Sequence, residues 1–230
     1  PVPGDKGPGP IVQRGAAYEH NGTPRIAETT NPILKLWAKK LMDEANARVA
    51  AGGLPFVTTS RCWPGGVPGL LLFPGEPVLF LQKPNEVWIL YQRDAQVRRV
   101  YLNVPHSKNP GYSWYGESVG HYENGDTLVV DTIGLDDKGP IDRYRTPHTR
   151  QLHVVERYKL ANGGKNLEVQ FTVEDPGTFT TAWNAKVDYG PAHGTGGTWR
   201  ESICNENSRD YFLDARKDIV PTPHDDSPDF

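Results

Sequence analysis

The sequence has few cysteines, no long apolar run and little net charge. Its 230 residues include two cysteines, and the formal net charge is -3 at pH 7. Two cysteines are too few for the usual structural zinc site. No run approaches the roughly 18 apolar residues of a membrane span, and the charge predicts no nucleic-acid or membrane surface. A P-loop, a nucleophile elbow and a dinucleotide fingerprint are also missing, so the chemistries that depend on these motifs are poorly supported.

Glycine and proline, in contrast, are plentiful, with 24 and 21 residues. Many turns are therefore expected, within a composition that is ordinary for a globular protein. We expect an extended arm over residues 1–30, one domain over 31–215, and a flexible tail over 216–230. The opening PVPGDKGPGP lacks the basic-then-apolar pattern of a leader, which suits a mature form from which a leader has been removed.

One helix is expected in the segment NPILKLWAKKLMDEANARVAAGG. Asn31 suits the N-cap and Pro32 the first helical position. Gly52 and Gly53 should end the helix. Apolar residues recur at the spacing of one helical face, at Leu34, Trp37, Leu41 and Ala45.

The remainder of the chain predicts β-structure in successive hairpins. Helical and strand patterns do not alternate, so a parallel α/β sheet is disfavoured. We expect an antiparallel barrel or a strongly curved sheet. The expected strands are LLLF, PVLFLQ, EVWILYQ (86–92), QVRRVYL (96–102), the two arms of GHYENGDTLVVDT (120–132), HTRQLHVVERYKL, LEVQFTVED, FTTAWNAKVDYG and GTWRESICNE.

The hairpin around Asn124 and Gly125 can pair in two registers. Asn-Gly favours a two-residue turn, which would set His121 opposite Leu128 and on an apolar face with valines. A three-residue loop, Glu123 to Gly125, would instead put His121 on one face with Val129 and Asp131. We favour the first register, although it sets Glu123 against the like-charged Asp126.

Two polar residues then stand on apolar strand faces, His121 and Glu156. In a barrel both would project into the lumen, where an isolated carboxylate is costly unless it is paired. His121 is either a packed core residue or an acid–base group, and Glu156 either pairs with an arginine such as Arg99 or takes part in chemistry. His153 and Glu156 resemble a metal-binding pair, but residues i and i+3 of a strand face opposite sides, so a metal there is disfavoured.

Loop residues supply further candidates. His106 and His148 lie in proline-containing loops, VPHS and TPHT, and are either solvated or at the mouth of a barrel. Trp114 and Tyr115 belong to an aromatic loop that could wall a ligand pocket or cover the end of a barrel. The cysteines Cys62 and Cys204 are either two separate thiols or one disulfide, and spacing alone does not decide.

Several segments together resemble a broad family of exported, mostly uncharacterised bacterial proteins. These segments are CWPGGVP (62–68), VRRVY (97–101), GESVGHYENGDTLVVDT (116–132), PHTRQLHVVERY (147–158), TVEDP (172–176) and CNEN (204–207). The resemblance covers roughly residues 55–215. Trp63 and Tyr122 depart from it, since the family more usually has an aliphatic residue and a Trp at these positions.

The resemblance implies a calycin-like β-barrel. With the helix predicted from the residues, the expected fold is mainly β, an antiparallel calycin- or lipocalin-like β-barrel with one N-terminal amphipathic helix. The resemblance also implies a Cys62–Cys204 disulfide, and with it an oxidising compartment, periplasmic or extracellular. Some members of the family are associated with cofactor-free lyase chemistry on lignin-derived aromatic compounds. For this chain that activity is an expectation that the residues must support.

We therefore expect a lyase, dehydratase or isomerase that needs no cofactor or metal and acts on a small aromatic or apolar compound, one version being loss of a small aldehyde. A lipocalin-like carrier is the alternative, and a structural envelope protein a third. No nucleic-acid partner is expected, and a homodimer is one option. The catalytic candidates are His121, Glu156, His148 and Tyr101, and the substrate-binding candidates are His106, Trp114, Tyr115 and Arg99.

Overall fold

The structure is a computed structural model that describes residues 26–51, 58, 62–72, 77–191 and 201–204. Most of the predicted N-terminal arm and all of the predicted tail lie outside the described residues. Within the described part, no helix is long and apolar enough to cross a membrane.

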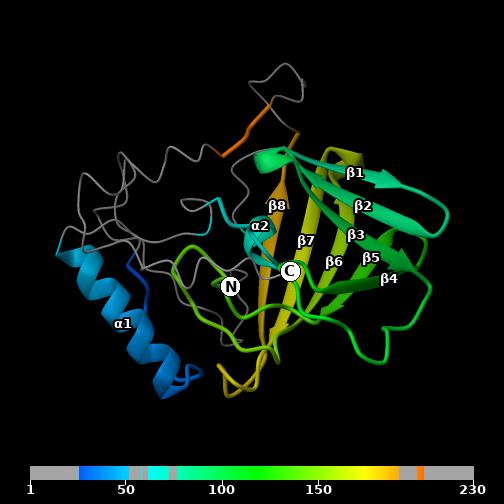
Figure 1. Cartoon of the computed structure of the whole chain (residues 1–230). Helices are drawn as coiled ribbons and strands as arrows, with labels where there is room; N and C mark the ends of the chain where they lie inside the picture. The colour runs from blue at the N-terminus through cyan, green and yellow to red at the C-terminus, as the bar shows by residue number, and fades with distance from the viewer. Residues whose placement is uncertain (1–25, 52–57, 59–61, 73–76, 192–200, 205–230) are drawn as a thin grey trace.

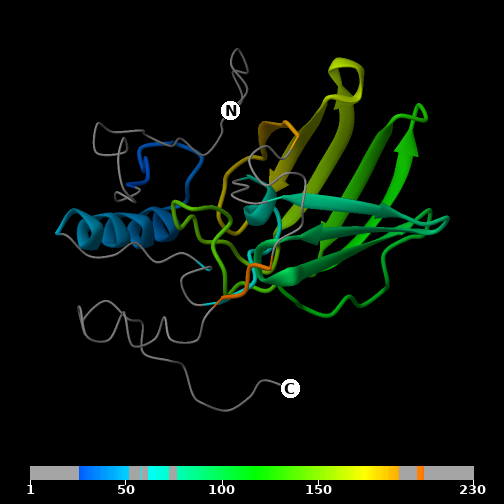
Figure 2. The same ribbon diagram turned by 90° about the horizontal axis from the view of Figure 1, so that it is seen from above.

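Eight strands form one sheet in which strand order follows chain order. The sheet curls into a half-barrel with β1 and β8 at its edges (Figures 1 and 2). The mainly β fold with an N-terminal helix is therefore confirmed. The strands are β1 (Val78–Gln82), β2 (Glu86–Tyr91), β3 (Gln96–Leu102), β4 (Glu117–Glu123), β5 (Thr127–Ile133), β6 (His153–Ala161), β7 (Asn166–Glu174) and β8 (Trp183–Tyr189).

The sheet departs from a fully antiparallel pattern at one place. β3 and β4 are parallel, through three residue pairs from Val100↔Ser118 to Leu102↔Gly120. The segment 103–116 carries the chain back along the sheet before β4 begins, so the two strands run in the same direction. All other neighbouring strands are antiparallel, as the hairpin pattern predicts.

Two expected strands are not seen as strands in their described residues. The segment LLLF lies mostly in a four-residue helix, α2 (Gly69–Leu72), whose Leu71 packs in the core. Figure 2 shows α2 on the open side of the curled sheet. Of GTWRESICNE, residues 201–204 are not in a strand, and the others lie outside the described residues.

The helix α1 (Leu36–Ala50) begins later than predicted. Leu34 forms an isolated bridge with Phe179, so the residues that precede α1 are extended against the segment before β8. Asn31 does not cap the helix. Its side chain instead accepts a hydrogen bond from the Ile33 backbone N–H, at 3.1 Å.

The predicted buried face of α1 is also wrong. Trp37 and Leu41 are exposed, whereas the buried residues are Ala38, Met42 and Val49. The helix lies to one side of the sheet and meets the loop between β5 and β6 (Figure 1). It therefore buries the face that meets that loop, where Met42 shares a small cluster with Ala27 and Tyr144.

The core fills the concave face of the half-barrel. Every second residue of the inner strands points into it, as strand geometry requires. This inner face is capped by residues from outside the sheet, among them Ile33, Leu71, Leu135, Ile141 and Phe179. Its strand residues include Val87, Ile89, Tyr91, Val100, Leu102, Leu128, Val130, Val154, Tyr158, Val169, Phe171, Val173 and Trp183.

The hairpin of β4 and β5 does not adopt the favoured register. His121 pairs with Val129, and Glu123 with Thr127. Asn124 and Gly125 do take positive φ, as expected of this turn, but Asp126 remains in the loop and shifts every pair by one. Asp126 forms an ion pair with Lys159 at 3.0 Å, so the shift also removes the like-charged Glu123/Asp126 pair.

The two cysteines form a disulfide, as the resemblance implies. Cys62 and Cys204 are bonded, with their Cα atoms 5.4 Å apart. The bond joins the segment before α2 to the segment after β8, and so links two regions that are 142 residues apart in the sequence.

Candidate functional site

The register separates the two residues that were expected to meet in a lumen. His121 lies on the convex outer face with its side chain 54% exposed, and its nearest charged partner is Glu123 at 3.5 Å. Glu156 points into the inner face and is 0% exposed. Their expected convergence in one lumen is therefore wrong, because the one-residue shift in the hairpin sends His121 to the other face.

Glu156 pairs with Arg98 and not with Arg99. Nη2 of Arg98 lies 2.5 Å from Oε2 of Glu156 in a pair that is almost completely buried. Nη2 also donates to Oγ1 of Thr132 at 2.6 Å, and Nε donates to Oγ of Ser118 at 3.0 Å. The Tyr158 hydroxyl donates to the other oxygen of Glu156 at 2.9 Å. This inner-face network holds Glu156 as a paired carboxylate.

Arg99 and Tyr101 lie on the outer face. Arg99 forms an ion pair with Glu86 at 2.9 Å and lies over the rings of Trp88 and Tyr101. Tyr101 is 38% exposed. The structure thus places both residues on the face opposite to Glu156.

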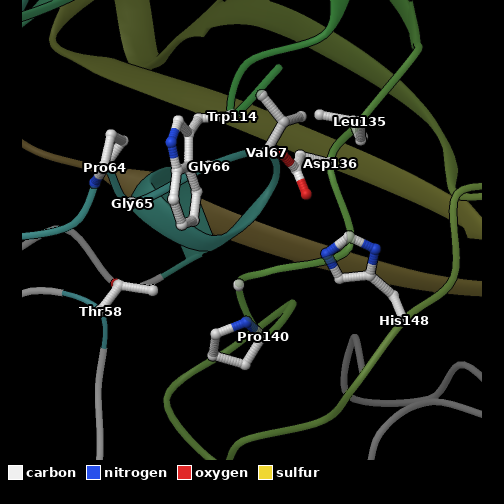
Figure 3. Close-up of a pocket in the computed structure, with 11 residues that line it drawn as sticks. Thr58, Pro64, Gly65, Gly66, Val67, Trp114, Leu135, Asp136, Pro140 and His148 are labelled. Carbon is white, nitrogen blue, oxygen red and sulfur yellow. The ribbon is translucent and has the colours of Figure 1, made fainter. Parts of the chain in front are cut away.

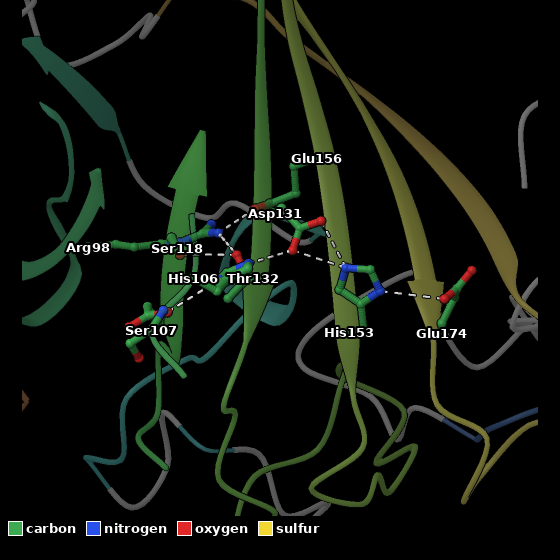
Figure 4. A network of polar contacts seen from close by, with 10 residues as sticks. Arg98, His106, Ser107, Ser118, Asp131, Thr132, His153, Glu156 and Glu174 are labelled. Carbon is green, nitrogen blue, oxygen red and sulfur yellow. Dashed lines mark hydrogen bonds and ion pairs between the residues drawn. The ribbon is translucent and has the colours of Figure 1, made fainter. Parts of the chain in front are cut away.

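His106 belongs to a row of five titratable residues on the outer face, which we term the outer-face chain: Glu117, His106, Asp131, His153 and Glu174. Figure 4 shows His106, Asp131, His153 and Glu174 of this chain. Each imidazole bridges two carboxylates. His106 lies 3.0 Å from Glu117 and 2.8 Å from Asp131, and His153 lies 3.0 Å from Asp131 and 3.4 Å from Glu174.

Pairing within the outer-face chain shifts the pKa values of His153 and Asp131 in opposite directions. Hydrogen bonding to Asp131 raises the pKa of His153, against a smaller opposing effect of burial. Burial alone would raise the pKa of Asp131, but hydrogen bonds from His153 and His106 together lower it. Three carboxylates and two imidazoles that are partly exposed to solvent therefore form a network whose strength depends on pH.

A small pocket brings together two of the predicted site residues, His148 and Trp114. Its volume is about 10 Å³, which is about the space of one water molecule. Figure 3 shows the imidazole of His148 pointing into this pocket, toward Trp114 and Asp136. The lining residues are Thr58, Pro64, Gly65, Gly66, Val67, Trp114, Leu135, Asp136, Gly139, Pro140 and His148.

The backbone fixes how His148 presents its imidazole. Nδ1 lies 3.1 Å from the carbonyl oxygen of Thr149, and a carbonyl can only accept, so Nδ1 carries the proton. Nε2 is then the unprotonated nitrogen on the pocket side. His148 is 8% exposed, and burial lowers its pKa, while the carboxylates of Asp175, Asp137 and Asp136 oppose that effect. The imidazole is therefore neutral at neutral pH, so that Nε2 can accept a proton.

The aromatic loop positions Trp114 at this pocket. The loop is anchored where the Ser113 backbone N–H donates to the Gly134 carbonyl at 3.0 Å. The Trp114 ring lies 5.3 Å from that of Trp63, beside the disulfide. Tyr115 points elsewhere, since its hydroxyl donates to the Gln96 side chain and its ring stacks on Tyr91 at 6.2 Å.

Sequence reasoning missed several residues of these three sites. Arg98 was missed because the sequence alone does not show which of the adjacent residues Arg98 and Arg99 points to the inner face. That becomes clear only when the register of β3 is known. Asp136 had no local signal. Asp131 was considered with His121, and His153 with Glu156. Only the pairing of β5 with β6 brings His153 and Asp131 together.

Comparisons of the chain with family models, with curated proteins and with solved structures give no match. The functional argument therefore rests on the geometry of the chain itself.

Proposed function

We propose that the protein is an acid–base enzyme of lyase, dehydratase or isomerase type, acting on a small aromatic or apolar molecule in the pocket of His148 and Trp114. One observation carries this proposal. A buried imidazole whose Nδ1 proton is held by a backbone carbonyl directs a basic Nε2 at a pocket. A positioned histidine that is neutral at working pH is the commonest general base in enzymes.

The surroundings of His148 suit a group that first takes a proton from the substrate and then returns it to the product. Nε2 would accept a proton from the substrate, and the nearby Asp136 carboxylate would favour the resulting imidazolium. In a retro-aldol version, Nε2 takes the proton of a hydroxyl and the carbon–carbon bond breaks to release a small aldehyde. The imidazolium then returns the proton to the carbon that kept the bonding electrons.

The walls of the pocket suit an apolar or aromatic substrate. Trp114, Val67 and Leu135 supply apolar surface, and Trp114 offers an indole face for stacking. With room for about one water molecule, the pocket has to widen when a substrate enters.

A carrier for a small apolar ligand is the second candidate, and the apolar walls of the same pocket favour it. In that reading His148 only orients the ligand.

We also propose that the half-barrel belongs to the calycin-like class and that the protein works in an oxidising compartment, periplasmic or extracellular. The Cys62–Cys204 disulfide supports the second of these proposals.

The test is turnover of a pool of small aromatic alcohols and carbonyl compounds, followed by mass spectrometry. We expect His148→Gln to lower turnover by about 100-fold or more, the usual loss when a general base is removed. The control is His121→Gln, because His121 is exposed on the outer face and should keep turnover within about twofold. The melting temperature of His148→Gln establishes that the variant is folded.

The pH profile gives a second readout. Because burial lowers the pKa of His148, kcat/KM should stay high at neutral pH and fall only on acidification below the ordinary histidine value of 6.5. Turnover that is unchanged in His148→Gln would contradict the enzyme proposal. Binding by wild type without any consumption of ligand would favour the carrier.

A further inference from the structure

The guanidinium of Arg98 has more donors than the inner face satisfies. Arg98 carries five N–H donors. Nε bonds to Ser118, and the two hydrogens of Nη2 bond to Thr132 and Glu156. Nη1 has no hydrogen-bond partner among the described residues, although Arg98 is only 1% exposed.

A charged donor in such a position needs an acceptor. Burial removes the bonds to solvent that an exposed guanidinium would make, and nothing replaces them at Nη1. The three bonds of Nε and Nη2 fix the plane of the guanidinium, so both Nη1 hydrogens have a fixed direction. The result is a pair of pre-oriented donors inside the half-barrel.

Tyr91 lies beside Arg98 on the inner face, because Ile89 of β2 pairs with Arg98 of β3 and Tyr91 is two residues further along β2. Burial raises the pKa of Tyr91, and the neighbouring Arg98 charge is the largest effect that opposes this rise. Tyr91 is 2% exposed and its ring stacks on Tyr115, so its hydroxyl is also held inside the core. Nη1 and this hydroxyl are therefore two polar groups in one buried region. The Tyr91 hydroxyl interacts with the Arg98 side chain, yet no described residue gives Nη1 a partner at normal hydrogen-bond geometry.

We propose that Nη1 of Arg98 and the Tyr91 hydroxyl form an internal binding site for one uncharged oxygen acceptor. Two sources share this chemistry, a water molecule and the carbonyl oxygen of a small aromatic ligand. An uncharged acceptor is favoured because Glu156 already neutralises Arg98 at 2.5 Å, and a bound anion would be a second buried negative charge. The site is independent of acid–base chemistry at His148.

The first test is a high-resolution crystal structure of the full chain. We expect an oxygen atom that belongs to no residue at about 2.7–3.2 Å from Nη1. The same atom should lie within hydrogen-bonding distance of the Tyr91 hydroxyl. An oxygen of the chain itself at that position, or no density there, would overturn the proposal.

The second test identifies the source of the oxygen. Acetophenone and α-methylstyrene have the same shape, but only acetophenone has a carbonyl oxygen, so their binding is compared by calorimetry and in crystals. Acetophenone that binds tighter, replaces the water at Nη1 and weakens several-fold in Tyr91→Phe identifies a ligand site. A water that stays at Nη1 in the presence of both compounds identifies water as the occupant.

The variant His148→Gln tests whether binding at Nη1 of Arg98 is independent of the proposed enzyme activity. Binding of acetophenone at Nη1 should be the same in His148→Gln and in wild type, even where turnover is lost. The internal site can therefore stand if the enzyme proposal fails, and the enzyme proposal can stand if no oxygen is found at Nη1.

Discussion

Glu156 and Arg98 face each other on the inner face of the sheet, with β4 and β5 between their strands. The guanidinium and the Tyr158 hydroxyl occupy the two oxygens of the buried Glu156 carboxylate. The pair is therefore a structural element of the core. Such pairs are most sensitive to the loss of one partner, because the other is then left charged and buried.

We predict that Glu156→Leu lowers the free energy of unfolding by about 3–5 kcal/mol, since it leaves the Arg98 charge without its partner. The double variant Arg98→Met/Glu156→Leu should recover most of that loss. Urea denaturation of the wild type, both single variants and the double variant measures the coupling energy. Losses in the two single variants that simply add in the double variant would contradict the ion-pair assignment.

The outer-face chain predicts a pH window of stability. The pKa of His153 is raised, so its contribution is fully present below the unfolded value of 6.5 and is lost as pH rises through the folded value. The pKa of Asp131 is lowered, so its contribution is present above the unfolded value of 3.8 and is lost as pH falls through the folded value. The chain should stabilise the protein most between these two limits.

His153→Gln should therefore remove about 0.2–1 kcal/mol of stability inside that window and much less above it, because partly exposed ion pairs contribute little. Melting temperatures between pH 4 and pH 9 measure the difference from wild type. His121→Gln is the matched control, as an outer-face histidine with one distant partner. An equal loss at every pH would mean that His153 acts only through packing.

At the scale of secondary-structure elements, local patterns predict the hairpins well. β2 and β3 are joined by Arg93, Asp94 and Ala95 as expected, because a hairpin depends on residues that are neighbours in the sequence. The parallel pairing of β3 with β4 had no such local signal. It depends on how the segment 103–116 returns along the sheet, and so on contacts between residues far apart in the sequence.

The candidate site was harder to predict than the fold for a related reason. Register in a strand has a period of two, so one unpaired residue, Asp126, moves His121 from the inner to the outer face. The apolar spacing also did not mark the buried face of α1, because the helix buries Ala38, Met42 and Val49 and packs Met42 against Tyr144 of the β5–β6 loop. His148 and Trp114 were predicted as loop residues, and only the folded chain shows that they share a pocket.

Gly116, the last residue of the segment 103–116 that leads to β4, is the basis of a further prediction. Gly116 has φ +61, and a Cβ there would lie 2.3 Å from the Ile133 carbonyl oxygen. Gly116→Ala therefore combines backbone strain with a clash, and we expect a loss of about 2–4 kcal/mol. Gly125→Ala is the control, since Gly125 has φ +75 but open space around it.

That control should lose only about 1–2 kcal/mol, the part due to positive φ alone. Chemical denaturation of both variants gives the comparison. A loss in Gly116→Ala that is no larger than in Gly125→Ala would mean that β4 and β5 can separate slightly at no cost.

For the whole molecule, the segment after β8 is attached to the sheet in two ways. Cys204 is bonded to Cys62, and its backbone N–H also donates to the Asp94 side chain at the β2–β3 turn. The Asp94 backbone N–H in turn donates to the Ser202 carbonyl at 2.6 Å. The disulfide closes a loop that spans 142 residues and contains the whole sheet.

The paired variant Cys62→Ser/Cys204→Ser should therefore be less stable by about 4–5 kcal/mol, because it removes a restraint on the unfolded chain. Urea denaturation with and without reductant measures this, and reduced wild type should match the variant. A loss well below this range, with the bonds at Asp94 still formed, would mean that those bonds hold the segment without the disulfide. Adding Asp94→Ala removes the side-chain bond to the backbone N–H of residue 204 and leaves the backbone bond to Ser202, so hydrogen exchange at the N–H of residue 204 should then become faster.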